Sequence, residues 1–340
     1  MRPLGSGVAR FELNTDPMAN DPSRWGHSLG NLAEIWLELL ELAGVRSVVE
    51  VGAYAGDTTR ILLDWAEHSG ARVLAIDPDP QPSLEQLAQA SPALTLIRAT
   101  SLEALATLDP CDAVILDGDH NYYTVSEELR LIEQGAGAAT LPLTICHDAC
   151  WPHGRRDAYY SIEQVPEEYR QPTVEAGHLF PDDPGIHDSG LVFFHHRLAT
   201  REGGPRNGVR TALEDFVGQR DELELAIVPA FFGLAVVWPR AAPWAADVAA
   251  ALAPLRDNPV IARLERNRIL NLARWEAEHA RAEGQQHEHD WLQQHWQASS
   301  ELLGHLLASR AFAVASWLSR LRRGGDGPIS KNEIRRVLGR

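Results

Sequence analysis

The spacing of apolar residues changes along the chain, and each spacing predicts a different kind of element. From Asn31 apolar positions recur at helical intervals as far as Leu42, and Gly44 is a natural end for that helix. Five short apolar runs then alternate with helical stretches, at residues 47–51, 72–76, 94–97, 112–116 and 141–146. This alternation is typical of a parallel sheet that is covered by helices.

The second half of the chain predicts the completion of that sheet and two additions to it. Residues 149–189 show no periodicity, so we interpret them as an insertion over the carboxyl edge of the sheet. A helix at 207–217 and a strand pair at 223–228 and 231–238 would follow. We therefore expect an α/β fold with a doubly wound, mostly parallel seven-stranded sheet. The predicted domains are an N-terminal arm (1–30), a main domain (31–240) with the insertion, and a helical C-terminal extension (255–340).

Charge and cysteine content narrow the classes of function. The formal net charge of -16 disfavours nucleic acid as a partner, because binding to phosphates needs a basic surface. Three cysteines are too few for a disulfide framework, and neither a secretory signal nor a membrane-spanning run is visible. We therefore expect a cytoplasmic protein.

Glycines and acidic residues stand where the predicted strands end, which is the edge where open parallel sheets bind ligands. The first strand leads into Gly52 and Gly56 and carries Glu50 near its end. The second strand ends at Asp77, and Ser101 follows the third. The glycine spacing differs from the dinucleotide fingerprint, so a pyrophosphate cradle is disfavoured. A plain strand-to-helix connection is the alternative interpretation of the glycines alone.

Taken together, these motifs resemble those of class I S-adenosylmethionine-dependent methyltransferases, which have a Rossmann-like fold. The resemblance rests on Glu50-Val51-Gly52-Ala53-Tyr54-Ala55-Gly56, Asp77 and Asp117-Gly118-Asp119-His120, and it spans about 31–239. It implies S-adenosylmethionine as the cofactor. The implied cofactor-binding residues are Glu50, Gly52, Tyr54, Gly56, Asp77, Ser101 and Asp117.

Acidic and histidine side chains follow the fourth and fifth predicted strands. Asp117 and His120 come after the fourth strand, and His147 and Asp148 after the fifth. Two carboxylates at adjacent strand ends can bind a hard cation and leave an imidazole as a base. Alternatively, the carboxylates orient the cofactor or a loop without metal, and His120 is a structural histidine.

The same residues resemble those of metal-dependent sugar O-methyltransferases of natural-product and surface-glycan biosynthesis. By that resemblance Asp117 and Asp148 hold Mg²⁺ or a similar divalent cation, and Asp117 and His120 are catalytic, with His120 as the base. Catechol-type relatives have an asparagine after the second aspartate, where this chain has Ala149. The sequence does not identify a third protein ligand. A zinc site at Cys146 and Cys150 is disfavoured, because no second ligand pair stands at suitable spacing.

The insertion begins with a mixture of aromatic and hydrogen-bonding side chains that suits a sugar. We expect the substrate to contact Trp151, Arg155, Arg156 and Tyr159, although an ordinary surface lid would have a similar composition.

The C-terminal tail has an apolar stretch at 311–318 followed by arginines. This pattern is consistent with peripheral membrane contact, with docking in an assembly complex, or with an oligomerisation helix. We also expect a homo-oligomer.

The sequence as a whole predicts methylation of a sugar hydroxyl in a glycan, nucleotide sugar or glycosylated metabolite. Two alternatives remain open. One is a metal-independent O- or N-methyltransferase of small molecules. The other is a non-catalytic module that binds cofactor or glycan in a surface-polysaccharide assembly complex.

Overall fold

A seven-stranded sheet forms the centre of the computed structural model, which describes residues 29–308 except 138–139, 176, 182 and 193–194. The strand order is β12-β13-β5-β4-β1-β2-β3. These strands are β1 (Ser47–Val51), β2 (Arg72–Ile76), β3 (Leu94–Ile97), β4 (Ala113–Leu116), β5 (Leu143–Cys146), β12 (Leu223–Val228) and β13 (Leu234–Pro239). The first five run parallel, and β13 is antiparallel to both β5 and β12. The predicted fold class is therefore confirmed.

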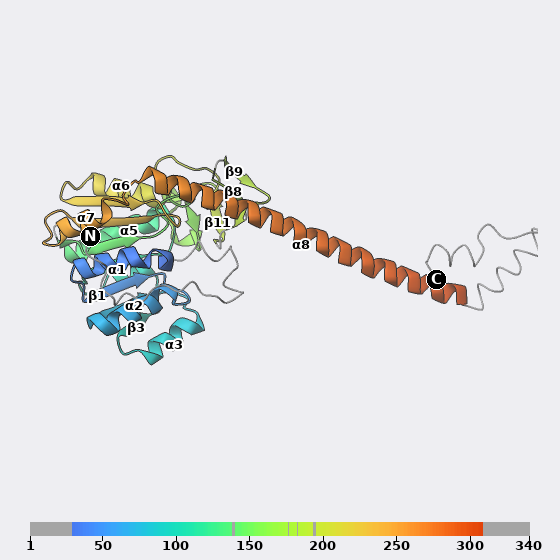
Figure 1. The fold of residues 1–340 in the computed structure, drawn as a ribbon, viewed down its shortest axis with the longest axis horizontal. Helices are drawn as coiled ribbons and strands as arrows, with labels where there is room; N and C mark the ends of the chain where they lie inside the picture. Colours follow the sequence, from blue (N-terminus) through green and yellow to red (C-terminus); the bar gives the residue numbers. More distant parts are fainter. Residues whose placement is uncertain (1–28, 138–139, 176, 182, 193–194, 309–340) are drawn as a thin grey trace, which may run out of the picture. The chain divides into compact units, whose positions relative to one another are not determined.

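Helices cover both faces of the sheet because successive strand side chains point to opposite sides. Val48 and Ile115 enter one core, whereas Val49 and Val114 enter the other. The first core includes α1 (Ala33–Leu42), preceded by the short helix η1 (Leu29–Leu32), together with α2 (Asp57–Ser69), α3 (Pro82–Ala90) and α7 (Ala245–Leu252). The second includes α4 (Ser101–Leu105), α5 (Tyr122–Ala136) and α6 (Val209–Gly218). Figure 1 shows these helices flanking the strands.

The region after β5 folds into two small antiparallel sheets. One has the order β6-β11-β7 and the other β10-β8-β9. Their strands are β6 (Ala158–Tyr159), β7 (Thr173–Val174), β8 (His178–Phe180), β9 (Asp183–His187), β10 (Leu191–Val192) and β11 (Arg197–Ala199), with the short helices η3 (Ile162–Gln164) and η4 (Glu167–Tyr169) between β6 and β7. Except for β9, these strands have two or three residues, which is below the length at which alternation becomes visible in sequence. The irregular insertion expected at 149–189 is therefore corrected to regular structure that extends to Ala199.

The helix α8 (Pro259–Ala308) crosses the boundary between two compact units, 1–277 and 278–340. In the first unit its residues Ile269, Leu272 and Ala273 pack with Phe232. In the described part of the second unit, Trp291 and Trp296 are exposed. Most of the predicted N-terminal arm and the basic tail lie outside the described residues. Within the part of the chain that is described, no helix is long and apolar enough to cross a membrane.

Candidate functional site

The turn between β1 and α2 brings the ends of β1 and β4 into close contact. Gly52 has φ 82°, and a Cβ atom there would lie 2.2 Å from the carbonyl oxygen of Asp117. Gly56 also has positive φ and stands at the start of α2. Only glycine fits the first position without moving a neighbouring backbone segment. The glycine turn therefore sets the spacing between the predicted cofactor residues and the β4 loop.

Asp77 fixes this turn from the end of β2. It is buried, and its two carboxylate oxygens accept hydrogen bonds from Tyr54 N at 2.7 Å and Asp79 N at 2.8 Å. Each carboxylate oxygen has a further lone pair, so these bonds leave acceptor capacity for a ribose hydroxyl. The Tyr54 side chain is exposed next to the same turn. This arrangement is compatible with the predicted roles of both residues.

Two buried glutamates, one of them the predicted cofactor residue Glu50, carry carboxyls inside the fold. Glu50 accepts a hydrogen bond from Thr59 Oγ1 at 2.6 Å, and burial raises the pKa of Glu50 to about 8. Burial also raises the pKa of Glu128 on α5 to about 8, against a hydrogen bond from Ser101. Ser101 therefore faces into the fold as well as standing at the start of α4. Burial away from water disfavours the charged form of both carboxyls.

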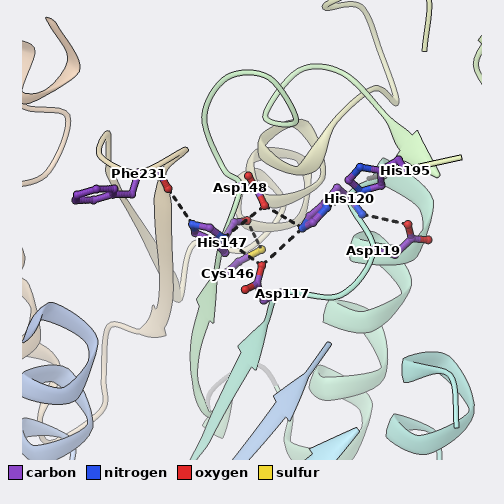
Figure 2. Close-up of polar contacts among 8 residues, drawn as sticks. All are labelled: Asp117, Asp119, His120, Cys146, His147, Asp148, His195 and Phe231. Atoms are coloured by element: carbon purple, nitrogen blue, oxygen red, sulfur yellow. Dashed lines mark hydrogen bonds and ion pairs between the residues drawn. The ribbon is translucent and has the colours of Figure 1, made fainter. Parts of the chain in front are cut away.

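Four side chains converge after β4 and β5, and Figure 2 shows them pointing toward one another. His120 Nε2 lies 3.0 Å from Asp148 Oδ2 and 3.6 Å from Asp117 Oδ1. His147 Nδ1 lies 3.1 Å from Asp117 Oδ1 and 3.4 Å from Asp148 Oδ2. The sheet thus brings together Asp117, His120 and Asp148, which were predicted to act at one site. We call these four residues the carboxylate–histidine cluster.

The carboxylates and the imidazoles of this cluster shift one another's pKa values. Burial lowers the pKa of His120, but the charge of Asp148 and contacts with Asp117 outweigh burial and raise that pKa to about 10. The same balance raises the pKa of His147 to about 9. Burial raises the pKa of Asp148, yet His120 and His147 hold it well below its usual value. The cluster is therefore mutually neutralised at neutral pH.

Both imidazoles are oriented by groups from distant parts of the chain (Figure 2). His147 Nε2 lies 2.8 Å from the carbonyl oxygen of Phe231, and His120 Nδ1 lies 2.8 Å from His195 Nε2. His153 stacks on His120 at 5.1 Å between ring centroids. His153, His195 and the Phe231 carbonyl are not among the site residues predicted from the sequence. A backbone carbonyl has no signature in sequence, and the histidines belong to segments without periodicity.

The predicted substrate residues have mixed positions. Arg156 and Tyr159 are buried, and their polar atoms are used by the fold: Arg156 donates to Ala199 O, and Tyr159 donates to Asp157 Oδ2 at 2.7 Å. The prediction that these two contact substrate is therefore corrected. Arg155 pairs with Glu214 on α6, and Trp151 packs in the small cores of the insertion.

Tyr160, not Tyr159, is the tyrosine next to the cluster. It is 42% exposed, and its ring centroid lies 4.4 Å from that of His195. Tyr160 directly follows β6, and neighbouring side chains of an extended segment point to opposite sides, which explains the difference. A ring that is exposed beside His195 can contact a bound acceptor.

A divalent cation fits the carboxylate–histidine cluster by two observations. One potential ligand atom each from Asp117, His147 and Asp148 lies within 4.8 Å of the others. In addition, His120 Nε2 is buried and makes no hydrogen bond of good geometry with any described residue, although both carboxylates face it. Carboxylate oxygens and imidazole nitrogens are ordinary ligands of divalent metal ions.

Comparison with known proteins adds the decisive observation. Residues 49–138 match a family model described as a methyltransferase domain. The chain carries a methyltransferase domain. This match spans the glycine turn, Asp77, Asp117 and His120, and it confirms the predicted enzyme class, an S-adenosylmethionine-dependent methyltransferase. No curated protein matches the chain.

Several solved structures are similar to this methyltransferase at low identity. S-adenosylhomocysteine-bound PaMTH1 from Podospora anserina is 14% identical with a TM-score of 0.42, covering 66% of this chain and 82% of its own. A putative caffeoyl-CoA O-methyltransferase from Staphylococcus aureus is 13% identical with a TM-score of 0.39, covering 62% and 83%. A putative O-methyltransferase from Klebsiella pneumoniae is 16% identical with a TM-score of 0.35, covering 62% and 80%. Likeness at this level does not extend to a substrate.

Proposed function

We propose that this methyltransferase methylates a hydroxyl oxygen on a sugar of a glycan, a nucleotide sugar or a glycosylated metabolite. One observation carries the proposal. His120 Nε2, buried and facing Asp117 and Asp148, lies on the β4 loop that the glycine turn contacts. A group able to take a proton is thereby adjacent to the predicted cofactor residues, which is what methylation of a hydroxyl needs.

The predicted cofactor side positions the methyl donor. Asp77 would accept hydrogen bonds from the ribose, while Glu50, Gly52, Tyr54 and Gly56 would line the methionine portion. When bound, S-adenosylmethionine supplies an electrophilic methyl group, which the acceptor oxygen takes as the sulfur–carbon bond breaks. The shape of the turn then decides whether the oxygen can approach in line with that bond.

The acceptor side manages the proton. If His120 Nδ1 donates to His195 Nε2, the lone pair of Nε2 faces Asp117 and Asp148, where the hydroxyl would lie. Asp117 and Asp148 would hold a divalent cation, which lowers the pKa of a hydroxyl bound to it and neutralises both carboxylates. Without their negative charge the pKa of His120 falls from about 10 toward its usual value, so that Nε2 can accept the proton at neutral pH. The cation and the base therefore depend on each other in this proposal.

A sugar acceptor is supported by the side chains around the cluster. The Tyr160 ring provides a planar face, and His153 and His195 add polar edges. Sugars present apolar faces for stacking and hydroxyls for hydrogen bonds.

Calorimetry and a transfer assay test the proposal together. Purified protein is titrated with S-adenosylmethionine and then assayed for methyl transfer to nucleotide sugars and glycosylated metabolites, before and after treatment with EDTA. We expect cofactor binding in both states, with transfer falling by about 100-fold or more after EDTA because base and cation act together. Undiminished transfer after EDTA would support the metal-independent alternative. Absence of cofactor binding would contradict the enzyme function itself.

A further inference from the structure

His147 lies between the two carboxylates that are predicted to hold a cation. It is buried, and its Nδ1 is 3.1 Å from Asp117 Oδ1 and 3.4 Å from Asp148 Oδ2. His147 directly follows β5 and precedes Asp148, so the sheet fixes its backbone. No other described side chain has one ligand atom close to both carboxylates and a second ring nitrogen held by the backbone.

The opposite nitrogen of this ring is held by a backbone carbonyl. Phe231 O lies 2.8 Å from His147 Nε2, and a carbonyl can only accept, so Nε2 carries a proton. The remaining nitrogen, Nδ1, then faces the carboxylates. Histidines that bind metals commonly donate their other N–H to a carbonyl or carboxylate in this way, which fixes the tautomer and the ring orientation.

The turn that contains Phe231 is itself rigidly supported. Phe232 N donates to Glu265 Oε1 on α8 at 2.8 Å, and Phe232 O accepts from Cys150 N at 2.7 Å. A Cβ atom at Gly233 would lie 2.5 Å from Cys150 Sγ, so the turn is packed tightly against the residues after β5. These contacts place the carbonyl that orients His147.

The chemistry of this ligand set differs from that of an oxygen site. Mg²⁺ takes almost only oxygen ligands, whereas imidazole nitrogen suits d-block ions. The position after Asp148, which is asparagine in catechol-type enzymes, is the buried Ala149 and offers no side-chain ligand. Among the described residues, the side chain grouped with both carboxylates within ligand reach is the imidazole of His147. His120 Nε2 also faces both carboxylates, and its other nitrogen is held by His195 and not by a backbone carbonyl.

We propose that His147 Nδ1 is the third protein ligand beside Asp117 and Asp148, and that the site selects a d-block divalent ion such as Mn²⁺, Co²⁺ or Zn²⁺ over Mg²⁺. This inference rests on the cation of the proposed function. It assigns His147 to the metal and leaves His120 as the base, since the two imidazoles approach the carboxylates from different segments.

The neighbouring group of His120, His153 and His195 provides the matched controls. Their nitrogens also approach within 4.8 Å of one another, so they are the competing location for a d-block ion. His153→Asn and His195→Gln would remove ligands from that location and leave Asp117, His147 and Asp148 intact. Comparing these variants with His147→Asn and His147→Ala separates the two locations.

Titration of EDTA-treated protein with CoCl₂ or MgCl₂ in a calorimeter tests the proposal. We expect Co²⁺ to bind at least about tenfold more tightly than Mg²⁺ and both His147 variants to lose at least about tenfold in Co²⁺ affinity. His153→Asn and His195→Gln should retain wild-type Co²⁺ affinity within about threefold. A preference for Mg²⁺, unchanged Co²⁺ binding by the His147 variants, or a matching loss in the His153 and His195 variants would each overturn it.

Pulsed electron paramagnetic resonance of Mn²⁺ gives a readout that does not depend on a variant folding normally. Coupling of Mn²⁺ to one imidazole nitrogen is expected in the wild-type protein and in His195→Gln, and its absence in the wild type would contradict the assignment. Titration with S-adenosylmethionine distinguishes this failure from failure of the proposed function. If the wild-type protein shows no nitrogen coupling but still binds the cofactor and transfers methyl, only the role of His147 is refuted.

Discussion

The two halves of the carboxyl edge of the sheet are built in different ways. The predicted cofactor half consists of short local turns, in which Tyr54 N donates to the carboxylate of Asp77 and Gly52 N donates to Ile76 O. The acceptor half collects His120, His147 and Asp148 after two strands and orients them with groups far along the chain, at His195 and Phe231. The local half can be recognised from sequence, and a single added Cβ atom is enough to disturb its geometry. The other half depends on the whole fold, so its parts should fail separately.

The largest effect on cofactor binding is expected for Gly52→Ala on the cofactor half. The new Cβ would lie 2.2 Å from Asp117 O at a residue with φ 82°, so backbone must move in both halves. Strain of about 1–3 kcal/mol corresponds to about fivefold to 150-fold weaker binding of S-adenosylmethionine, and the clash adds to this. Calorimetry measures the affinity.

Gly70→Ala is the matched control for that change. Gly70 has φ 69°, and nothing lies within 4 Å of a Cβ built there, so it has the strain without the clash. We expect cofactor affinity close to that of the wild type. Equal losses in the two variants would mean that the contact between Gly52 and Asp117 has no special role.

Asp148→Asn should separate the two halves. Asp148 lies 3.0 Å from His120 Nε2 and 3.4 Å from His147 Nδ1, so the variant loses the charge that both imidazoles face. We expect methyl transfer to fall about 100-fold while cofactor affinity stays within about threefold. Transfer rates and calorimetry on the same preparation measure both, with the exposed Asp247→Asn as a control. Weakened cofactor binding of similar size would show that the halves are not independent.

A smaller effect is expected for His195→Gln. His195 orients His120 through one hydrogen bond of 2.8 Å, and such a bond contributes about 0.5–1.5 kcal/mol. We therefore expect the rate of transfer to fall by up to about tenfold, with a changed pH profile because the tautomer of His120 is less well fixed. The rate measured from pH 6 to pH 10 tests this. A profile identical in shape to that of the wild type would remove His195 from the account.

The smallest effect is expected for the buried Glu128 and concerns how the stability of the fold depends on pH. Burial raises the pKa of Glu128 from 4.5 to about 8. Between these values the unfolded chain has released this proton and the folded protein has not, so its contribution is fully present below about pH 4.5 and is lost as pH rises through about 8. Glu128→Gln should therefore reduce the fall in melting temperature between pH 5 and pH 8. The exposed Glu222→Gln serves as control, and an unchanged fall in Glu128→Gln would refute the explanation.

The sequence was sufficient for the sheet and for the strand-end positions of the residues in the local half. Strands β1, β2 and β3 have the predicted bounds because their apolar runs are bounded by clear turn and helix signals. Gly52, Asp77, Asp117, His120 and Asp148 lie at the strand ends where the pattern placed them. Position after a strand is a property that sequence can show, since the carboxyl ends of parallel strands meet at one edge.

The rest of the acceptor half could not be predicted for physical reasons. His195 reaches His120 only because the short strands of the insertion return to the sheet, and strands of two or three residues leave no periodic signal. Phe231 contributes a carbonyl, which every residue possesses. Arg156 and Tyr159 have the composition of a binding surface, yet burial assigns them to the interior. Composition alone does not distinguish a ligand surface from a polar core.

A single-turnover experiment on His120→Gln tests the central claim, that His120 takes the proton of the acceptor hydroxyl. Wild type and variant are saturated with S-adenosylmethionine, mixed with an excess of an accepted sugar, and quenched over time, with the surface variant His68→Ala as control. We predict equal cofactor affinity in all three proteins and a transfer rate about 100-fold to 10⁴-fold lower in His120→Gln alone. A transfer rate in His120→Gln equal to that of the wild type would contradict the account.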